Sequence, residues 1–229
     1  MRQHKINIDA LDIIQKNIHT HSPYPSLVNI VAVTKTFNFT SIVSAKENKI
    51  SHIGENKVQE FLLKTKDHPK LTNNIETHLI GHLQSNKANK AIDLFDVIQT
   101  VDSLKIANKI NSVAEKKGVP KSIFIQINVG SDPNKYGFKL DKVYQNIEII
   151  EKLPHVHILG LMTILPFYKD VTQTQPLFNK MKQIQTKTTD KISPTCKFLS
   201  MGMSRDHVYA LQEGATHLRI GTKLYGQRQ

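Results

Sequence analysis

Short apolar runs alternate with amphipathic stretches along most of the chain. The first such run, residues 28–35 (VNIVAVTK), is β-branched and too short for an independent helix, so it predicts a buried strand. The segment before it carries apolar residues at helical spacing and predicts an N-terminal helix, with its buried face formed by Leu11, Ile14 and Ile18. Residues 21–25 break the pattern between the two.

The same unit, an apolar run followed by a helical pattern, recurs to the end of the chain. The further strands expected are 50–53, 75–80, 97–101, 123–129, 156–161, 197–200 and 218–220. The clearest helix is 104–117, with Asp102 or Ser103 as its cap and Gly118 as its end. We also expect a helix opening with Pro176 that buries Leu177, Met181 and Ile184, and a helix over 205–213.

Eight strands that alternate with helices predict a parallel sheet, and eight is the number of strands that closes a barrel. We therefore expect a single-domain (β/α)8 TIM barrel over residues 1–229, preceded by an N-terminal helix. The alternative is an open, doubly wound sheet. Its dinucleotide fingerprint is missing, because residues 36–39 after the first strand contain no glycine.

Lys35 continues a row of aliphatic side chains on the first strand. In strand alternation it shares a face with Val31 and Val33, whereas Ile30, Ala32 and Thr34 share the other. Two interpretations are open. Lys35 is either a solvated residue where the strand emerges, or it lies in a partly dry pocket and serves as an amine nucleophile.

Composition narrows the class of protein. The 229 residues are 39% apolar, which suffices for a sizeable core, and no stretch approaches 18 consecutive apolar residues. The polar start is not followed by the apolar core of a signal peptide, so we expect a cytoplasmic protein that does not enter membranes. The lone Cys196 excludes an internal disulfide, and a core position suits it better than a reactive one.

The net charge of +12 raises the possibility of a nucleic-acid partner. The excess comes from scattered lysines, because the chain has only four arginines, at positions 2, 205, 219 and 228. Nucleic-acid surfaces usually add arginine and stacking aromatics, and here there is no tryptophan and no cluster of basic and aromatic residues. We expect no nucleic-acid binding.

The loops after the last two expected strands have the composition of a phosphate site. Residues 200–204 (SMGMS) follow the seventh strand and lead towards a helix, and Gly221-Thr222 follows the eighth. In barrels, phosphate is often held by these two loops. Each loop alone is more often an ordinary helix cap, but the occurrence of both at the two expected positions makes a phosphate site an equal alternative.

Arg219 interrupts Leu218 and Ile220 in the eighth strand, so it faces the barrel interior if they face the helices. A buried guanidinium needs an acceptor. The acceptor is either an acidic side chain across the barrel or a lone pair on a ligand. A reactive lysine, a phosphate site and an arginine between them match the needs of pyridoxal phosphate: an aldehyde partner, a phosphate anchor and a donor to the ring nitrogen.

Several motifs carry a resemblance to a known family. They are AVTK (32–35), GENKVQE (54–60), HLIGHLQSNK (78–87), GLM (160–162) and LSMGMS (199–204), and together they span nearly the whole chain. This series resembles the pyridoxal phosphate homeostasis protein family. The resemblance implies a barrel similar to the N-terminal domain of alanine racemase, the fold type III of pyridoxal phosphate proteins.

The resemblance also implies roles for individual residues. The cofactor, pyridoxal 5'-phosphate, would be held as a Schiff base on Lys35. Ser200, Ser204, Gly221 and Thr222 would surround its phosphate. Two further residues complete the implied cofactor site, namely Arg219 at the pyridine nitrogen and Asn56 near the ring.

The departures from the family pattern are small. Thr77 stands where an aromatic residue is usual, and Ala91 where a branched apolar residue is usual. We expect no metal site, because His78 and His82 are not spaced or accompanied like metal ligands. Glu55 and Glu60 are interpreted as solvated or helix-start carboxylates without a catalytic role.

An amino-acid racemase is the main alternative function, since it would use the same barrel, lysine and arginine. Two-base racemisation needs a second acid/base group, which such enzymes take from a further domain, and the sequence ends at Gln229. An arginine rather than a carboxylate at the ring nitrogen also weakens the ring as an electron sink, which disfavours transaminase chemistry. We therefore expect a monomeric carrier without catalytic residues, which buffers pyridoxal phosphate or delivers it to enzymes that require it.

Overall fold

The computed structural model describes residues 3–227, in which eight parallel strands form a closed barrel. The strands are β1 Asn29–Val33, β2 His52–Glu55, β3 Glu76–Leu79, β4 Val97–Val101, β5 Lys121–Gln126, β6 Val156–Met162, β7 Phe198–Met203 and β8 His217–Ile220. Each strand pairs with the next in chain order, and β8 pairs with β1 through Asn29↔His217 and Val31↔Arg219. The expected (β/α)8 barrel is confirmed, and the open sheet is excluded.

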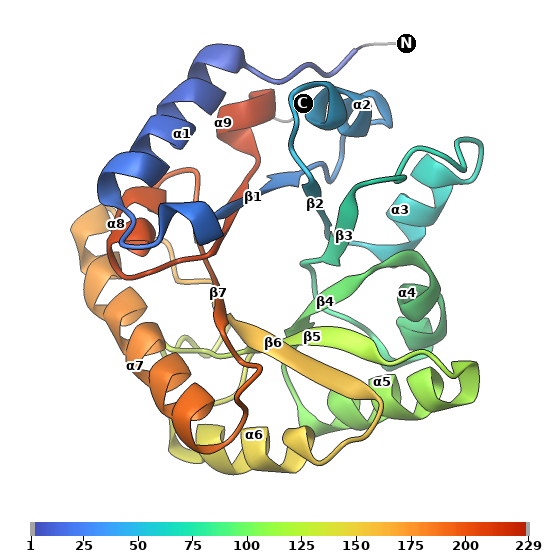
Figure 1. The fold of residues 1–229 in the computed structure, drawn as a ribbon, viewed down its shortest axis with the longest axis vertical. Helices are drawn as coiled ribbons and strands as arrows, with labels where there is room; N and C mark the ends of the chain where they lie inside the picture. The colour runs from blue at the N-terminus through green and yellow to red at the C-terminus, as the bar shows by residue number, and fades with distance from the viewer. Residues whose placement is uncertain (1–2, 228–229) are drawn as a thin grey trace.

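The helices form a ring around the barrel (Figure 1). Their bounds are α1 Ile8–His21, α2 Thr40–Glu47, α3 Val58–Thr65, α4 Ala88–Leu94, α5 Leu104–Lys117, α6 Val143–Glu151, α7 Gln175–Lys191, α8 His207–Gln212 and α9 Thr222–Tyr225. Short 3-10 helices lie at Pro25–Leu27, Ser85–Lys87, Leu140–Lys142 and Val171–Thr174. None of the helices within residues 3–227 is both long and apolar enough to span a membrane.

Helix α5 illustrates why the pattern predicts these elements well. The Ser103 hydroxyl accepts a hydrogen bond from the Ile106 N–H at 3.4 Å, which caps the first turn. Gly118 ends the helix with φ of 65°, a left-handed conformation that is cheap only for glycine. The bounds expected from the sequence are those observed.

The N-terminal helix α1 closes the ring next to the end of the chain. Its apolar face is buried as expected, through Leu11, Ile14 and Ile18. The helix packs against α8 and α9, and the Asn7 N–H donates to the Leu224 carbonyl at 2.8 Å. The first and last described segments therefore brace each other.

Most of the apolar core lies between the strands and the helices, and a smaller cluster of Val97, Phe124 and Met162 lies inside the barrel. Large apolar side chains usually fill the interior of such barrels. Here several buried polar side chains share that space, namely His78, Gln99, Ser200, His217 and Arg219. The interior is therefore partly a hydrogen-bonded network.

Some boundaries differ from the sequence prediction. Strand β7 continues to Met203 because Gly202, with φ of 89°, and a register shift between Ser200 and Met203 keep it paired. Helix α8 therefore begins at His207, and the four-residue helix α9 was not predicted at all. In α7, Leu177 is only half-buried, and Phe178 takes the core position.

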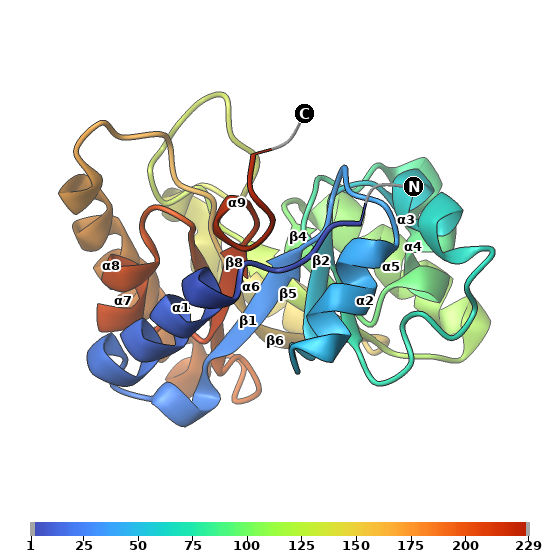
Figure 2. The same ribbon diagram turned by 90° about the horizontal axis from the view of Figure 1, so that it is seen from above.

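Strands β2 and β5 are also displaced, β2 towards later residues and β5 towards earlier ones. Gly54 lies within β2, paired with Val33 and His78, and a Cβ at this position would meet the Ile80 side chain at 2.9 Å. Figure 2 shows two long loops, after β5 and after β6, rising on one side of the barrel. They begin at the carboxyl ends of their strands, which is the active-site face of barrel enzymes.

Candidate functional site

A cavity of about 540 Å³ opens at the carboxyl ends of the strands. Every strand or the loop after it contributes to its lining. Of the residues that the resemblance assigns to the cofactor site, the cavity is lined by Lys35, Asn56, Ser204, Arg219, Gly221 and Thr222. The barrel therefore brings together residues from both ends of the chain, as the motifs predict.

Lys35 lies two residues beyond the end of β1, and Val33 precedes it in the cavity lining, in agreement with strand alternation. A buried ion pair between Glu55 and Lys64 lies under this turn. The Thr34 hydroxyl donates to Glu55 at 2.7 Å, and the Lys64 ammonium donates to the Thr34 carbonyl at 2.8 Å. The backbone next to Lys35 is thus held by groups that are themselves out of water.

The same cluster also holds the far side of the turn. The Thr36 N–H donates to the Glu60 carboxylate, and Thr36 has a φ of 68°, which is unusual for a β-branched residue. Glu55 was expected to be solvated or at a helix start. It is instead fully buried at the end of β2, where Lys64 and Thr34 both bond its Oε1, whereas Oε2 is buried without a hydrogen-bond partner.

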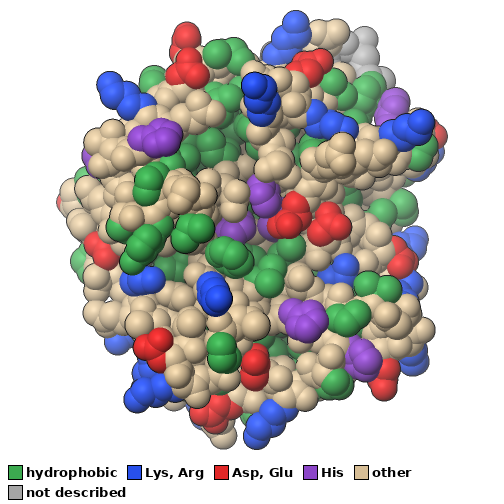
Figure 3. Space-filling view, in the orientation of Figure 1, with side chains coloured by type: hydrophobic (Ala, Val, Ile, Leu, Met, Phe, Trp, Pro, Cys, Tyr) green, Lys and Arg blue, Asp and Glu red, His purple; other side chains and the backbone are tan. Residues whose placement is uncertain are grey.

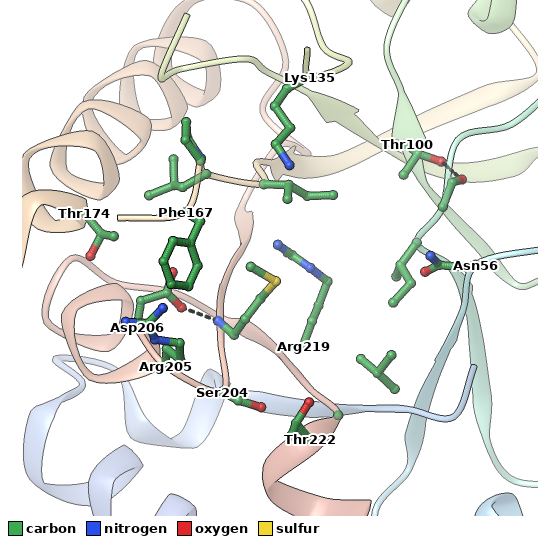
Figure 4. Close-up of a pocket in the computed structure, with 18 of the residues that line it drawn as sticks. Asn56, Thr100, Lys135, Phe167, Thr174, Ser204, Arg205, Asp206, Arg219 and Thr222 are labelled. Carbon is green, nitrogen blue, oxygen red and sulfur yellow. Dashed lines mark hydrogen bonds between the residues drawn. The ribbon is translucent and has the colours of Figure 1, made fainter. Parts of the chain in front are cut away.

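Arg219 lies at the floor of the cavity, with its guanidinium at the centre of the view in Figure 4. Nη1 donates to the Ser200 hydroxyl and Nη2 to the Thr163 carbonyl, both at 2.6 Å. Within residues 3–227 no acidic side chain forms an ion pair with it. Burial lowers the Arg219 pKa to about 10, so it remains cationic at neutral pH. The cavity floor is therefore positive.

A chain of hydrogen bonds runs from Arg219 down the barrel axis. The Ser200 hydroxyl donates to Gln99 Oε1 at 2.6 Å, and Gln99 Nε2 lies 3.0 Å from His78 Nδ1. His78 Nε2 in turn lies 3.0 Å from Glu76 Oε1. We call Arg219, Ser200, Gln99, His78 and Glu76 the axial chain.

The two ends of the axial chain set the direction of every hydrogen bond in it. Arginine can only donate, so Ser200 accepts from it and passes its own proton to the Gln99 carbonyl oxygen. The Gln99 amide then donates to His78 Nδ1, which leaves the ring proton on Nε2, facing the Glu76 carboxylate. Burial lowers the His78 pKa, which agrees with this neutral tautomer.

Ser200 is the one sequence-predicted phosphate residue that the structure does not bring to the cavity lining. Its side chain is fully buried below Arg219, and its hydroxyl is committed to Arg219 and Gln99. The expectation fails because β7 extends past Ser200, so that the loop begins only at Ser204. Ser200 supports Arg219 instead.

The loops after β7 and β8 meet at one side of the cavity. The Lys223 N–H donates to the Ser204 hydroxyl at 3.3 Å, and Thr222 begins the short helix α9. Figure 4 shows the Ser204 and Thr222 side chains beside each other. Asp206 orders the first loop by accepting a hydrogen bond from the Met203 N–H at 2.6 Å. Hydroxyls and backbone N–H groups therefore gather where a phosphate was expected.

Sequence reasoning missed several residues that line the cavity, among them Lys135 and Tyr136 on the loop after β5. The Lys135 ammonium points into the cavity from the loop after β5 (Figure 4). The Tyr136 ring stacks on His82 at a centroid distance of 3.9 Å, and His82 Nδ1 lies 2.7 Å from the Asp102 carboxylate. The length of the loop after β5 was the only available signal, because such loops often carry function.

This arrangement fits a compact phosphorylated carbonyl compound with an aromatic ring nitrogen. The amine of Lys35, the cation of Arg219 and the hydroxyls of Ser204 and Thr222 line one cavity, and each is a different kind of partner. Arg219 is a buried cation, and its hydrogen-bond partners Ser200 and Thr163 are neutral groups. It therefore favours an electron-rich ligand atom nearby.

Comparison with known proteins agrees with this geometry. The family described as the alanine racemase N-terminal domain matches residues 6–229. The chain is 37% identical over 206 residues to a pyridoxal phosphate homeostasis protein of Synechocystis, covering 89% of this chain and 93% of that one. A protein of the same name from Haemophilus influenzae is 33% identical over 224 residues, covering 95% and 94%.

Solved structures show the same relationship. PipY of Synechococcus elongatus, solved with pyridoxal phosphate bound, superposes with a TM-score of 0.84 at 32% identity, covering 95% of this chain and 99% of that one. An alanine racemase of Clostridium difficile has a TM-score of 0.74 at 19% identity, and the match covers 98% of this chain and 58% of the racemase. The racemase likeness shows a shared barrel fold.

Proposed function

Because this chain belongs to the pyridoxal phosphate homeostasis protein family, we propose that it binds pyridoxal 5'-phosphate in the cavity and buffers or delivers this cofactor. The observation that carries the proposal is the convergence of Lys35, Arg219 and the Ser204 and Thr222 hydroxyls on one cavity. The binding of pyridoxal phosphate by PipY supports it.

Each residue has a proposed task in holding the cofactor. Lys35 supplies the amine that forms a Schiff base with the aldehyde, on a turn held by the buried Glu55 and Lys64 pair. Arg219 donates to the ring nitrogen, and Asn56 lies beside the ring. Ser204, Gly221 and Thr222 bind the phosphate at the meeting of two loops.

Arg219 favours a carrier role over transamination. The bound cofactor supplies an electron sink for carbanions, and that sink is strongest when the ring nitrogen is protonated. A guanidinium whose pKa is about 10 stays charged at neutral pH and donates its proton without transferring it. The ring nitrogen beside it therefore stays unprotonated, which suits storage better than transamination. A racemase would use the same arginine, so an activity assay has to decide between carrier and racemase.

The experiment that tests this proposal combines a spectrum with an activity assay. Purified protein with added pyridoxal phosphate should show the visible absorption band of a protein-bound imine, and borohydride should remove that band. Racemisation of alanine should stay near background. Absence of the visible band would contradict the proposed binding of the cofactor. Racemisation of alanine at about 1 per second or faster would support the racemase alternative instead.

Removing a single phosphate donor should weaken retention of the cofactor. Ser204→Ala and Thr222→Ala each remove one hydroxyl from the meeting point of the loops, and a charge-assisted hydrogen bond is worth about 1.5–3 kcal/mol. We therefore expect the dissociation constant, measured by equilibrium dialysis after long incubation, to rise about 10- to 150-fold in each variant.

Thr174→Ala is the matched control for these two variants. Thr174 also lines the cavity, but it lies away from Ser204 and Thr222 (Figure 4), and its hydroxyl donates to the Val171 carbonyl at 2.7 Å. Its loss should leave cofactor affinity close to that of the natural protein. If all three variants bind the cofactor with equal affinity, the phosphate does not lie at Ser204 and Thr222.

The proposed partners follow from the same site. Pyridoxal phosphate is the small-molecule partner, and enzymes that require it are the proposed recipients. The cavity lies within one chain, so a monomer is sufficient to form it. The absence of nucleic-acid binding stays a prediction from the scattered lysines and the lack of tryptophan.

A further inference from the structure

Three strands begin with side chains that commonly bind metals, at the end of the barrel opposite the cofactor cavity. They are His52 in β2, Glu76 in β3 and His217 in β8, each the first residue of its strand. His52 and Glu76 are register partners, and His52 Nδ1 lies 3.3 Å from Glu76 Oε1. One ligand atom from each of the three residues lies within 4.8 Å of the other two.

The three side chains and their neighbours are packed closely. His52 Nδ1 lies 3.1 Å from His78 Nε2, which lies 3.0 Å from Glu76 Oε1. The His217 ring stands edge-on to the His52 ring, with the ring centroids 5.8 Å apart. Imidazoles and carboxylates are side chains that transition metals bind.

The Thr216 hydroxyl holds the orientation of the His217 ring. It accepts a hydrogen bond from the Leu199 N–H at 2.9 Å and lies 2.9 Å from His217 Nδ1. Its single proton can go either to that nitrogen or to the Leu199 carbonyl, 3.2 Å away. Because Nδ1 is engaged by Thr216, Nε2 is the ring nitrogen left for an ion, and outer hydrogen bonds of this kind orient metal-bound histidines.

We propose that His52, Glu76 and His217 form a binding site for a divalent transition metal, with zinc as the preferred ion. Two imidazoles and one carboxylate form a recurrent ligand set for zinc, with the fourth position left for water. Softer thiolate ligands are absent from the set, and the imidazoles disfavour magnesium and calcium.

The cluster reaches the surface of the molecule on one side. Histidine side chains (purple) and acidic side chains (red) gather near the centre of the face seen in Figure 3. The Glu76 side chain is 41% exposed, so it can move towards an incoming ion. Ligands of tetrahedral zinc lie roughly 3.4 Å apart, so the outermost atoms have to approach by about 1.4 Å.

The charge around Glu76 also suits a cation. In the part of the chain that the structure describes, its ion pairs are with His52 and His78, and no lysine or arginine takes part in them. The expectation from the sequence that the chain has no metal site considered only His78 and His82. The proposed ligands were not recognised because they lie on three strands that are far apart in the sequence and meet only in the barrel.

The test is a direct measurement of metal binding to the full chain. Equilibrium dialysis against micromolar zinc, followed by metal analysis, should give one tightly bound ion per chain. Cobalt at the same site should give the intense visible bands of a four-coordinate ion. Glu76→Gln removes the only anionic ligand while keeping the size of the half-exposed side chain, and should weaken zinc binding at least about 100-fold.

His19→Ala is the matched control, because His19 is an exposed histidine on the outer face of α1. This variant should bind zinc and cobalt like the natural protein. His217→Asn, with folding checked by circular dichroism, is a second test of the same site and should lose the cobalt bands. If Glu76→Gln and His217→Asn retain the affinity and the spectrum of the natural protein, the proposed site is wrong. Neither readout depends on pyridoxal phosphate, so the result is independent of the proposed function.

Discussion

Lys35→Ala is expected to abolish the adduct that borohydride traps between the protein and pyridoxal phosphate. Lys35 follows β1 on the inward-facing row that begins with Val31 and Val33, and it lines the cavity. An imine needs a primary amine at the aldehyde, and alanine supplies none. Mass spectrometry of peptides from the reduced natural protein should find the added mass on Lys35 alone.

Lys135→Ala is the control that makes this result specific. Lys135 also lines the cavity, and its ammonium points into the same space (Figure 4). It sits on a loop, whereas Lys35 follows a strand whose turn is held by buried groups. Lys135→Ala should therefore keep the trapped adduct. An adduct that persists in Lys35→Ala and disappears in Lys135→Ala would reverse the assignment.

Lys64→Met is expected to have the largest effect on stability. The Lys64 and Glu55 side chains are 4% and 1% exposed, so the substitution leaves a carboxylate buried without its counter-ion. Removing one partner of a buried ion pair costs about 3–5 kcal/mol. The free energy of unfolding in urea should fall by about this amount at neutral pH, and the loss should be accompanied by weaker attachment of the cofactor to Lys35.

The double variant Glu55→Gln with Lys64→Met tests the cause of this loss. It removes both charges, and the amide introduced in place of the carboxylate can still accept from the Thr34 hydroxyl, so most of the lost stability should return. A double variant as unstable as Lys64→Met would show that packing of the lysine stem, rather than the charge, is what matters.

The effect of Lys64→Met should also depend on pH. Burial raises the pKa of Glu55 above its ordinary value of 4.5, and Lys64 opposes that shift. Without Lys64 the folded-state pKa rises further, so the folded state binds a proton more readily than the unfolded chain. The stability of the Lys64→Met variant should then be highest below about pH 4.5, and it should fall as the pH rises through the raised pKa of Glu55. The difference from the natural protein should therefore be smallest in mild acid.

The barrel and the positions of Lys35 and Arg219 could be predicted from the sequence, because both depend on strand alternation. A residue two places beyond Val33, or between Leu218 and Ile220, has its face decided by the local pattern. The caps of α5 were predictable for the same reason, since Ser103 and Gly118 act on residues next to them.

Features that depend on closure of the barrel could not be predicted. The role of Ser200 depends on Gln99, which reaches it from β4 across the interior. The end of β7 depends on a register shift against β8, which has no periodic signal. Lys135 reaches the cavity from a loop without a repeating pattern, so its direction follows only from the folded structure.

The axial chain makes distant positions of the barrel interdependent in evolution. Every donor in it faces an acceptor, from Arg219 at the cavity to Glu76 at the opposite end. Replacing Gln99 with glutamate would put a carboxylate, which cannot donate, against the lone pair of His78 Nδ1. Such a change is tolerable only together with a second change beside it. Positions 76, 78, 99, 200 and 219 should therefore be inherited as a set, although only the last of them lines the cavity.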